Sequence, residues 1–376
     1  MRIVVAGALA NKPFNGGAAW TRLSWVLGFV RLGHDVSFVE QIAPDACVND
    51  AGDRCPLEAS INFRYFTQVI EAFGLRDRAA LIVENGASPP IDEADLLVNI
   101  SGHLTLERLK SACRVRAFVD LDPGYTQFWS EAGLARERLR DHHFYFTVGA
   151  NIGKPNCAIP TLGLAWRPVR QPVVLGEWPV APSESERRFT TIASWRGPYG
   201  RIPHAGGQYG VKAHEFRKFV SLPARSSGSF EIALDVDPAD RGDVDLLRAN
   251  AWNVVDPRVV AGDPLAFRRY VQGSSAEFSV AQGIYVETNS GWFSDRTVRY
   301  LASGKPVVVQ DTGFASVYPT GYGLLPFKTV EQAQQGIDKI VCDYLTHART
   351  ARTIAEEFFG SDVVLRDVLR QVGIDH

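Results

Sequence analysis

Residues 290–309 read SGWFSDRTVRYLASGKPVVV. Ser294 is a favourable N-cap and Asp295 suits a first helical turn, because an acceptor oxygen and a negative charge both stabilise the exposed backbone N–H groups there. Gly304 suits a helix end, and Pro306 prevents the helix from continuing. The pattern predicts a helix over 294–302, followed by a buried strand over 307–310.

The start of this helix is a candidate anion site. Free backbone N–H groups and the positive end of the helix dipole favour a phosphate group. Arg296 and Arg299 lie one turn apart, so both can face one anion. The alternative is a capped surface helix with solvated arginines. The predicted diphosphate site contains Ser290, Gly291, Trp292, Ser294, Asp295, Arg296 and Arg299.

Strand-like and helix-like segments alternate on both sides of this stretch. A strand over 2–6 and a helix over 18–32 open the first half, and a strand over 189–194 opens the second. Such alternation predicts two α/β domains with parallel sheets, and ligands bind such sheets at the carboxyl ends of the strands. The expected division is a first domain at 1–164, a proline-rich linker at 165–188, a second domain at 189–350, and helices at 351–376 that pack back on the first domain.

Composition limits the function classes. A length of 376 residues suits two domains, and a net charge of −2 gives no general attraction to nucleic acid or to an anionic membrane. No apolar run reaches the roughly 18 residues of a spanning helix, and the first residues resemble a strand rather than a signal peptide. The five cysteines are scattered without zinc-site spacing. A cytoplasmic protein with reduced thiols is expected.

Two segments resemble the GT-B glycosyltransferases of group 1, or family 4. They are the tail ASGKPVV at 302–308 and the closing helix over 351–359. The resemblance implies two facing Rossmann-like domains with a deep cleft, and a nucleotide sugar held by the second domain. The family's Glu-x7-Glu pair, which holds sugar and ribose hydroxyls, corresponds here to Gly291 and Arg299. A guanidinium is better suited to phosphate than to a ribose diol, because it only donates hydrogen bonds.

The resemblance also suggests donor-side residues earlier in the second domain. A basic residue from the loops after its first strand commonly meets the diphosphate, and Arg196 and Lys212 are the matching candidates. The segment at 252–257 lies where the family binds the base, so Val255 is a candidate for a base contact. For both cations the alternative is an ordinary surface residue.

The first domain supplies an acceptor-side candidate. The loop at 8–19 contains Asn15, Gly16 and Gly17, and Trp20 follows it. Adjacent glycines permit a close backbone approach to a ligand, and the resemblance places this loop at the acceptor and sugar side of the cleft. The dinucleotide fingerprint Gly-x-Gly-x-x-Gly is absent, which argues against a nicotinamide enzyme. The alternative is a flexible turn.

Three residues at predicted strand ends are candidates for a catalytic base. Asp120 and Asp122 point to the same side of an extended strand, and His103 follows the preceding strand. A carboxylate or imidazole there suits proton removal from an acceptor hydroxyl. We rank Asp122 first, His103 second and Asp120 third. The alternative for the aspartates is a turn cap and a solvated strand end.

These features predict a glycosyltransferase that moves a sugar from a nucleotide-diphosphate sugar, such as a UDP-sugar, to an acceptor hydroxyl or another nucleophile. A small molecule or natural product is the acceptor class considered, and neither a metal ion nor a cofactor is expected. One alternative is a nucleotide-sugar epimerase or another GT-B-shaped sugar enzyme. The other is a two-lobed sugar- or nucleotide-binding protein without catalysis.

Overall fold

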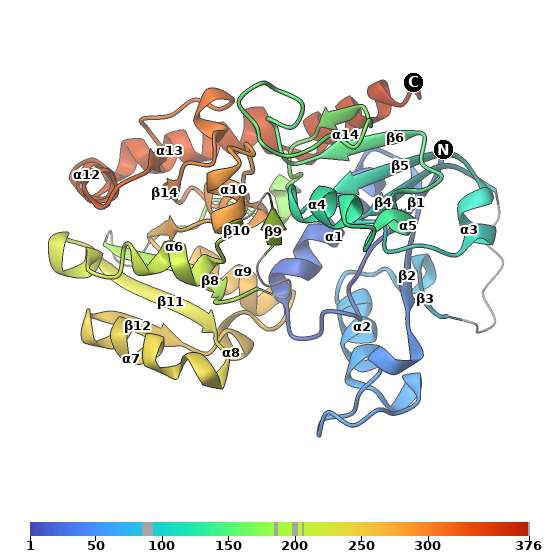
Figure 1. The fold of residues 1–376 in the computed structure, drawn as a ribbon, viewed down its shortest axis with the longest axis horizontal. Coiled ribbons are helices and arrows are strands. Elements are labelled where there is room, and N and C mark those ends of the chain that lie inside the picture. Colours follow the sequence, from blue (N-terminus) through green and yellow to red (C-terminus); the bar gives the residue numbers. More distant parts are fainter. Residues whose placement is uncertain (85–92, 184–186, 198–201, 205–206, 375–376) are drawn as a thin grey trace.

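The computed structural model describes residues 1–84, 93–183, 187–197, 202–204 and 207–374. It contains two parallel β-sheets with helices packed on them, one formed by each half of the chain (Figure 1). We call the part around the first sheet the N-terminal lobe and the part around the second the C-terminal lobe. The two lobes lie side by side, and α1 (Gly16–Arg31) lies between the first sheet and the C-terminal lobe.

The sheet of the N-terminal lobe has the strand order β3-β2-β1-β4-β5-β6-β7, and all neighbours are parallel. Its strands are β1 (Arg2–Ala6), β2 (Asp35–Ile42), β3 (Ala79–Val83), β4 (Ala94–Ile100), β5 (Cys113–Asp120), β6 (Phe144–Thr147) and β7 (Trp166–Pro168). Besides α1, its helices are α2 (Ile61–Ala72), α3 (Glu107–Ser111), α4 (Tyr125–Glu131) and α5 (Arg136–Leu139).

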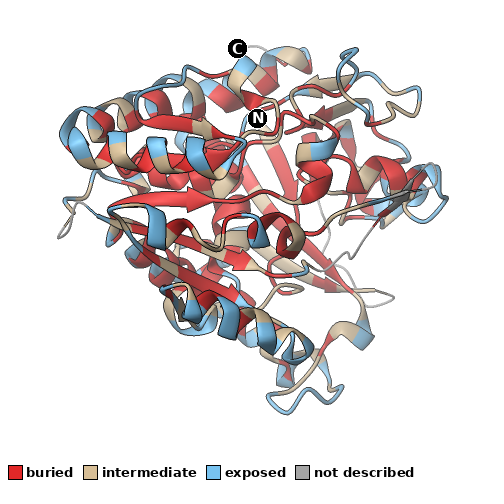
Figure 2. Cartoon of the chain, turned by 60° about the vertical axis from the view of Figure 1, so that its left-hand side comes forward, coloured by how far each residue is buried: buried red, intermediate tan, exposed pale blue. Residues whose placement is uncertain are grey.

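The central strand β1 shows why this sheet forms. Ile3 and Val5 belong to one apolar cluster, whereas Val4 and Ala6 belong to another. Because successive side chains of a strand point to opposite faces, a strand buried on both faces must be apolar throughout. The burial pattern agrees, since most strand residues are buried and most exposed residues lie on outer helix faces and loops (Figure 2).

The sheet of the C-terminal lobe has the order β12-β11-β8-β13-β14-β15, again with parallel neighbours. Its strands are β8 (Arg188–Ser194), β11 (Ser229–Asp235), β12 (Trp252–Val255), β13 (Ala276–Ser279), β14 (Val307–Gln310) and β15 (Leu324–Phe327), and β9 (Ile202–His204) with β10 (Gly207–Tyr209) forms a separate antiparallel pair. Its helices are α6 (Lys212–Arg217), α7 (Arg241–Ala249), α8 (Pro257–Ala261), α9 (Pro264–Gln272), α10 (Gly283–Glu287), α11 (Asp295–Ala302), α12 (Val330–Cys342) and α13 (Tyr344–Ile354).

Short helical turns complete the described elements. The single turns are η1 (Pro44–Ala46), η2 (Leu57–Ala59), η3 (Arg76–Arg78), η4 (Leu175–Glu177), η5 (Leu222–Arg225), η6 (Pro238–Asp240) and η7 (Phe314–Ser316). A π-helical turn, η8 (Ala355–Phe359), joins α13 to the last helix, α14 (Ser361–Gln371).

The chain returns to the N-terminal lobe at its end, where α14 packs against α1. The packing is close, because a Cβ added at Gly28 of α1 would lie 2.5 Å from Cδ1 of Leu365. Two connecting segments meet beside this packing. The N–H of Val173 donates to the Phe359 carbonyl, and the N–H of Ser361 donates to the Val173 carbonyl, both at 2.8 Å.

One expectation about the connection differs from the structure. Residues 166–168, inside the segment expected to be a linker, form β7 at the edge of the first sheet and pair with β6. The ring of the half-buried Trp166 lies 5.8 Å from that of Tyr145, and this contact packs the edge strand against its neighbour β6. Pro168 is compatible with this position, because an edge strand leaves one side of its backbone without ladder hydrogen bonds.

Candidate functional site

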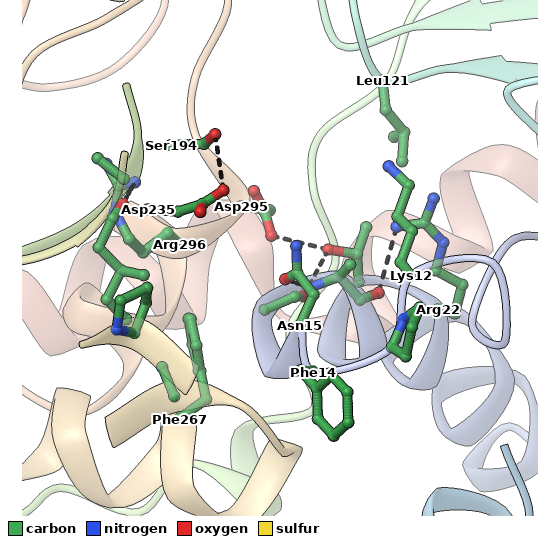
Figure 3. A pocket seen from close by; sticks show the side chains of 18 of the residues that line it. Lys12, Phe14, Asn15, Arg22, Leu121, Ser194, Asp235, Phe267, Asp295 and Arg296 are labelled. Atoms are coloured by element: carbon green, nitrogen blue, oxygen red, sulfur yellow. Dashed lines mark hydrogen bonds between the residues drawn. The ribbon is translucent and has the colours of Figure 1, made fainter. Parts of the chain in front are cut away.

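A cavity of about 400 Å³ lies between the lobes, where the carboxyl ends of β5, β8 and β11 meet the loop after β1 (Figure 3). Its volume falls within the roughly 300–1,000 Å³ of ligand pockets. The lining residues of the N-terminal lobe are Lys12, Pro13, Phe14, Asn15, Gly17, Ala18, Thr21, Arg22, Leu121 and Asp122, joined by Gln171. Those of the C-terminal lobe are Ile192, Ala193, Ser194, Asp235, Pro257, Arg258, Ala261, Phe267, Trp292, Asp295 and Arg296.

A buried carboxylate shapes the loop between β1 and α1. Glu40 of β2 is fully buried and accepts the backbone N–H groups of Leu9, Ala10 and Asn11 at 2.7, 2.6 and 2.8 Å. Burial raises the pKa of Glu40, and the three N–H donors oppose that rise. The carboxylate therefore fixes the stem of the loop that carries residues 12–15 into the cavity.

The candidates of the glycine loop have different positions. Asn15 lines the cavity and caps α1, since its Oδ1 accepts the N–H of Ala18 at 2.9 Å. Gly17 also lines the cavity. Gly16 instead packs against the other lobe, where an added Cβ would clash with the carbonyl of Asp263. A Cβ added at Gly17 would lie 2.9 Å from the ring of Phe267, so both glycines permit the close approach of the two lobes.

Trp20 does not take the expected position at the sugar side. Its side chain is 0% exposed and does not line the cavity. Its indole N–H donates to the carbonyl of Pro264 at 2.7 Å, and its ring lies 5.0 Å from that of Trp178. The expectation is corrected: Trp20 joins the lobes and has no face available to a sugar.

The start of α11 reaches the cavity as the sequence predicts. Ser294 caps the helix and accepts the N–H of Arg296 at 3.2 Å, and Trp292, Asp295 and Arg296 line the cavity. The guanidinium of Arg296 is not a fully available cation, because its Nε donates to Glu277 at 2.6 Å. Its two Nη atoms also donate, one to the carbonyl of Ile192 and the other to the hydroxyl of Ser279, so at most two of its five N–H groups remain for a ligand. Glu277 compensates much of its charge.

Three other members of the predicted diphosphate site lie away from the cavity. Arg299 is buried and donates to Asp295 at 3.0 Å and to Ser24 of α1 at 3.4 Å. The hydroxyl of Ser290 donates to the carbonyl of Tyr285, and the N–H of Gly291 donates to the carbonyl of Thr312. The expectation for Arg299, Ser290 and Gly291 is corrected, because their donors stabilise the turn and the packing of α11 on α1.

The remaining donor-side candidates do not line the cavity either. Arg196 is exposed and forms a two-point ion pair with Asp240. Lys212 is buried and donates to the carbonyl of Val280; burial, and secondarily Arg296, lowers its pKa to about 7. Val255 is the last residue of β12, two residues before α8, whose first residues Pro257 and Arg258 do line the cavity.

Asp120 is the buried organiser of the loop after β5. Its carboxylate accepts from the N–H of Asp122 at 3.1 Å and from the side chains of Thr126, Gln127 and Thr147 at 2.7, 3.0 and 2.8 Å. Burial raises its pKa, and the three side-chain donors oppose that rise. With its oxygens already occupied and 0% exposure, Asp120 is corrected from a candidate base to a structural residue.

Asp122 lines the cavity, and the hydroxyl of Tyr285 from the other lobe donates to it at 3.3 Å. His103 does not line the cavity. Burial, followed by the charges of Arg22 and Lys12, lowers the pKa of His103 well below its usual value, so its imidazole is neutral at neutral pH. Of the three base candidates, the structure therefore places only Asp122 at the cavity.

Several lining residues were missed by the sequence reasoning. Lys12 and Phe14 lie in the same loop as Asn15 and the two glycines, and Arg22 is a charged residue within an otherwise apolar helix face. The sequence therefore contained a signal for each of them. Phe14 has a positive φ of 59°, which is strained for an aromatic residue. The guanidinium of Arg258 lies 5.8 Å from its ring centre, so this strained turn carries a contact between the lobes.

Two further properties concern the described part of the chain. Its His, Cys, Asp and Glu residues form no group of three or more that could hold a metal ion. Among the same residues, no helix has both the length and the apolar character needed to cross a bilayer.

The fold matches solved glycosyltransferase structures. An α-glucosyltransferase in complex with UDP and a 13-mer DNA containing a central A:G mismatch is 14% identical, with 99% of each chain covered and a TM-score of 0.61. Anabaena Alr3699/HepE in complex with UDP and glucose is 12% identical, with 99% of each chain covered and a TM-score of 0.56. Sucrose-phosphate synthase from Thermosynechococcus elongatus is 12% identical, with 99% of each chain covered and a TM-score of 0.54.

No protein-family model and no curated protein matches the sequence. The similarity is therefore one of fold, extending over nearly the whole chain. The protein has the GT-B fold, which confirms the fold class implied by the tail at 302–308 and by the double α/β pattern.

Proposed function

We propose that this protein is a nucleotide-sugar-dependent glycosyltransferase that transfers a sugar from a nucleoside-diphosphate sugar to an acceptor nucleophile. The observation that carries the proposal is the cavity at the carboxyl ends of both sheets, with the start of α11 and Arg296 on one wall and Asp122 on another. Solved proteins of the same fold were obtained with UDP, which favours a uridine donor.

The donor diphosphate fits best at the start of α11. The helix dipole and the N–H donors of Arg296 act on negative charge there, and this charge grows on the leaving diphosphate as the glycosidic bond breaks. The nucleoside then extends along the ends of β8 and β11, where the hydroxyl of Ser194 donates to Asp235 at 3.2 Å. Asp235 offers carboxylate oxygens to ribose hydroxyls, a role that Arg299 cannot take.

Asp122 is the proposed base. It lies on the N-terminal wall of the cavity, held by a loop that Asp120 organises and contacted by Tyr285 from the other lobe. Proton removal from an acceptor hydroxyl would raise its nucleophilicity toward the anomeric carbon. We further propose that no metal ion is needed, because N–H donors and cationic side chains around the cavity supply the electrostatic stabilisation. Unchanged turnover in excess EDTA is the expected result.

The proposal is tested by calorimetry with UDP, GDP, ADP and dTDP, followed by nucleotide-release assays with the sugar of the best binder. Asp122→Asn should lower turnover by about 100-fold or more, the scale of general-base catalysis, while leaving nucleotide affinity unchanged. Asp77→Asn, an exposed aspartate on η3, is the matched control. Product analysis separates transfer from epimerisation. Failure of all four nucleotides to bind, or full turnover in Asp122→Asn, would contradict the proposal.

A further inference from the structure

Two cationic side chains lie together on the N-terminal wall of the cavity. Lys12 comes from the loop after β1, and Arg22 from the second turn of α1. Both side chains extend toward Leu121, at the end of β5, whereas Ser194, Asp235 and Arg296 gather on the other side of the cavity (Figure 3). Asn15 and Asp295 lie between the two groups (Figure 3).

Lys12 has no hydrogen bond or ion pair from its ammonium group to any residue that the structure describes. Three carboxylates are near enough to influence its charge, namely Glu40, Asp122 and Asp295. Glu40 is occupied by the loop N–H groups, Asp295 accepts from Thr21 at 2.7 Å and from an arginine of its own helix, and Asp122 accepts from a tyrosine. The structure of the protein therefore leaves the ammonium group available to a ligand.

Arg22 is held rigidly beside it. Its side chain is 5% exposed, and its Nη1 donates to the carbonyl of Ala18 at 3.2 Å. Gly7, at the end of β1, makes room for it, because an added Cβ there would lie 3.1 Å from Cγ of Arg22. Burial, and secondarily Arg22, lowers the pKa of Lys12. Two like charges in a partly desolvated wall are unfavourable, and an anionic ligand between them would offset that cost.

We propose that Lys12 and Arg22 bind a phosphate group carried by a small acceptor, and so place the acceptor's reacting hydroxyl beside Asp122. An ammonium binds phosphate as a point charge, and the guanidinium of Arg22 adds a second positive charge to the same wall, so we call the pair a phosphate clamp. The proposal rests on the proposed function. The clamp is assigned to the acceptor because Arg296, the cation proposed to meet the donor diphosphate, lies on the other side of the cavity, with Asn15 and Asp295 between (Figure 3).

A small acceptor fits the enclosure better than a polymer. The cavity is about 400 Å³, and the proposed donor and acceptor would have to share it. The net charge of −2 provides no general attraction for a polyanion. The clamp therefore selects one phosphate monoester on a compact molecule, such as a sugar phosphate, rather than an extended phosphodiester backbone.

The experiment uses the full chain saturated with UDP, titrated by calorimetry with inorganic phosphate, glucose 6-phosphate and glucose. The wild type should bind phosphate and glucose 6-phosphate, and bind glucose at least about 10-fold more weakly than glucose 6-phosphate, the scale of one charge-assisted contact. Lys12→Met should weaken phosphate and glucose 6-phosphate about 10-fold or more and leave UDP affinity unchanged. Lys339→Met, at an exposed lysine of α12, is the matched control and should change neither.

A second variant separates charge from folding. Lys12→Arg retains the cation and should retain phosphate binding, so its behaviour distinguishes lost charge from a damaged loop. Equal losses of UDP and phosphate affinity in Lys12→Met would assign the clamp to the donor and overturn the inference. So would equal affinities for glucose and glucose 6-phosphate, or displacement of phosphate by a 13-mer DNA duplex but not by glucose 6-phosphate. If no nucleotide binds, the proposed function fails, while phosphate titration of the nucleotide-free protein still tests the clamp.

Discussion

Replacing Arg296 by Met should destabilise the protein strongly, whatever it does to ligand binding. The Arg296 side chain is 12% exposed, and its partner Glu277 is 0% exposed with an N–O distance of 2.6 Å. The second carboxylate oxygen of Glu277 has no hydrogen-bond partner among the described residues. Arg296→Met therefore leaves a fully buried carboxylate without its cation.

The expected loss is about 3–5 kcal/mol, the usual cost of breaking a buried ion pair from one side. A total stability of about 5–15 kcal/mol makes that loss easily measurable by urea unfolding, monitored through tryptophan fluorescence. The double variant Glu277→Leu, Arg296→Met removes both charges and should regain most of the lost stability, because replacing a buried ion pair by apolar residues often leaves stability unchanged. Arg225→Met, which breaks the exposed pair with Glu331, is the matched control and should change stability far less than Arg296→Met.

The same variants separate stability from ligand binding. If Arg296 meets the diphosphate, the single and the double variant should both bind UDP about 10-fold or more weakly, although only the single variant is strongly destabilised. A single variant within about 1 kcal/mol of the wild type would refute the stability argument. A double variant as unstable as the single one would show that the cost does not come from the stranded carboxylate.

Three further changes test other parts of the structure. Glu40→Gln should lower stability by about 2–4 kcal/mol in urea unfolding, because each carboxylate oxygen accepts two N–H donors and the amide NH₂ group would face one of those two pairs. A change below about 0.5 kcal/mol would contradict this. Burial lowers the pKa of Lys212 from 10.5 to about 7. Between these two pH values the unfolded chain binds more protons than the folded chain, so the free energy of unfolding should rise with pH, by up to about 1.4 kcal/mol per pH unit. Lys212→Met should remove that part of the rise between pH 7.5 and 9.5, and identical slopes would mean that the buried lysine stays charged. Gly16→Ala should push the lobes apart at Asp263, lowering UDP affinity and stability by about 1–3 kcal/mol, and unchanged values would disprove the close contact.

Much of the fold was predictable because its signals are local. Ser294 caps α11 as expected, and Gly304, with a φ of 70°, ends it. The alternation of strand-like and helix-like segments predicted both parallel sheets. The short edge strand at 166–168 was missed because its sequence resembles a linker, and only its pairing with β6 identifies it.

The site was less predictable, because partners distant in sequence decide what a charged residue does. Arg296 and Arg299 lie one helical turn apart, as their spacing predicts, but the spacing does not reveal that α1 covers Arg299. Arg196 likewise pairs with Asp240, 44 residues later. In contrast, Asp122 was ranked above Asp120 at the sequence level, and the structure gives the reason: the first reaches the cavity, whereas the second is enclosed by four donors.

The packing of α14 on α1 has a consequence for synthesis on the ribosome. The N-terminal sheet is complete once β7 has emerged, yet the face of α1 around Gly28 stays uncovered until residues 361–371 are translated. At about 5–20 residues per second, the nascent chain waits roughly 10–40 s for its last helix. During that interval an apolar groove is available to chaperones, and a chain terminated early would keep it permanently.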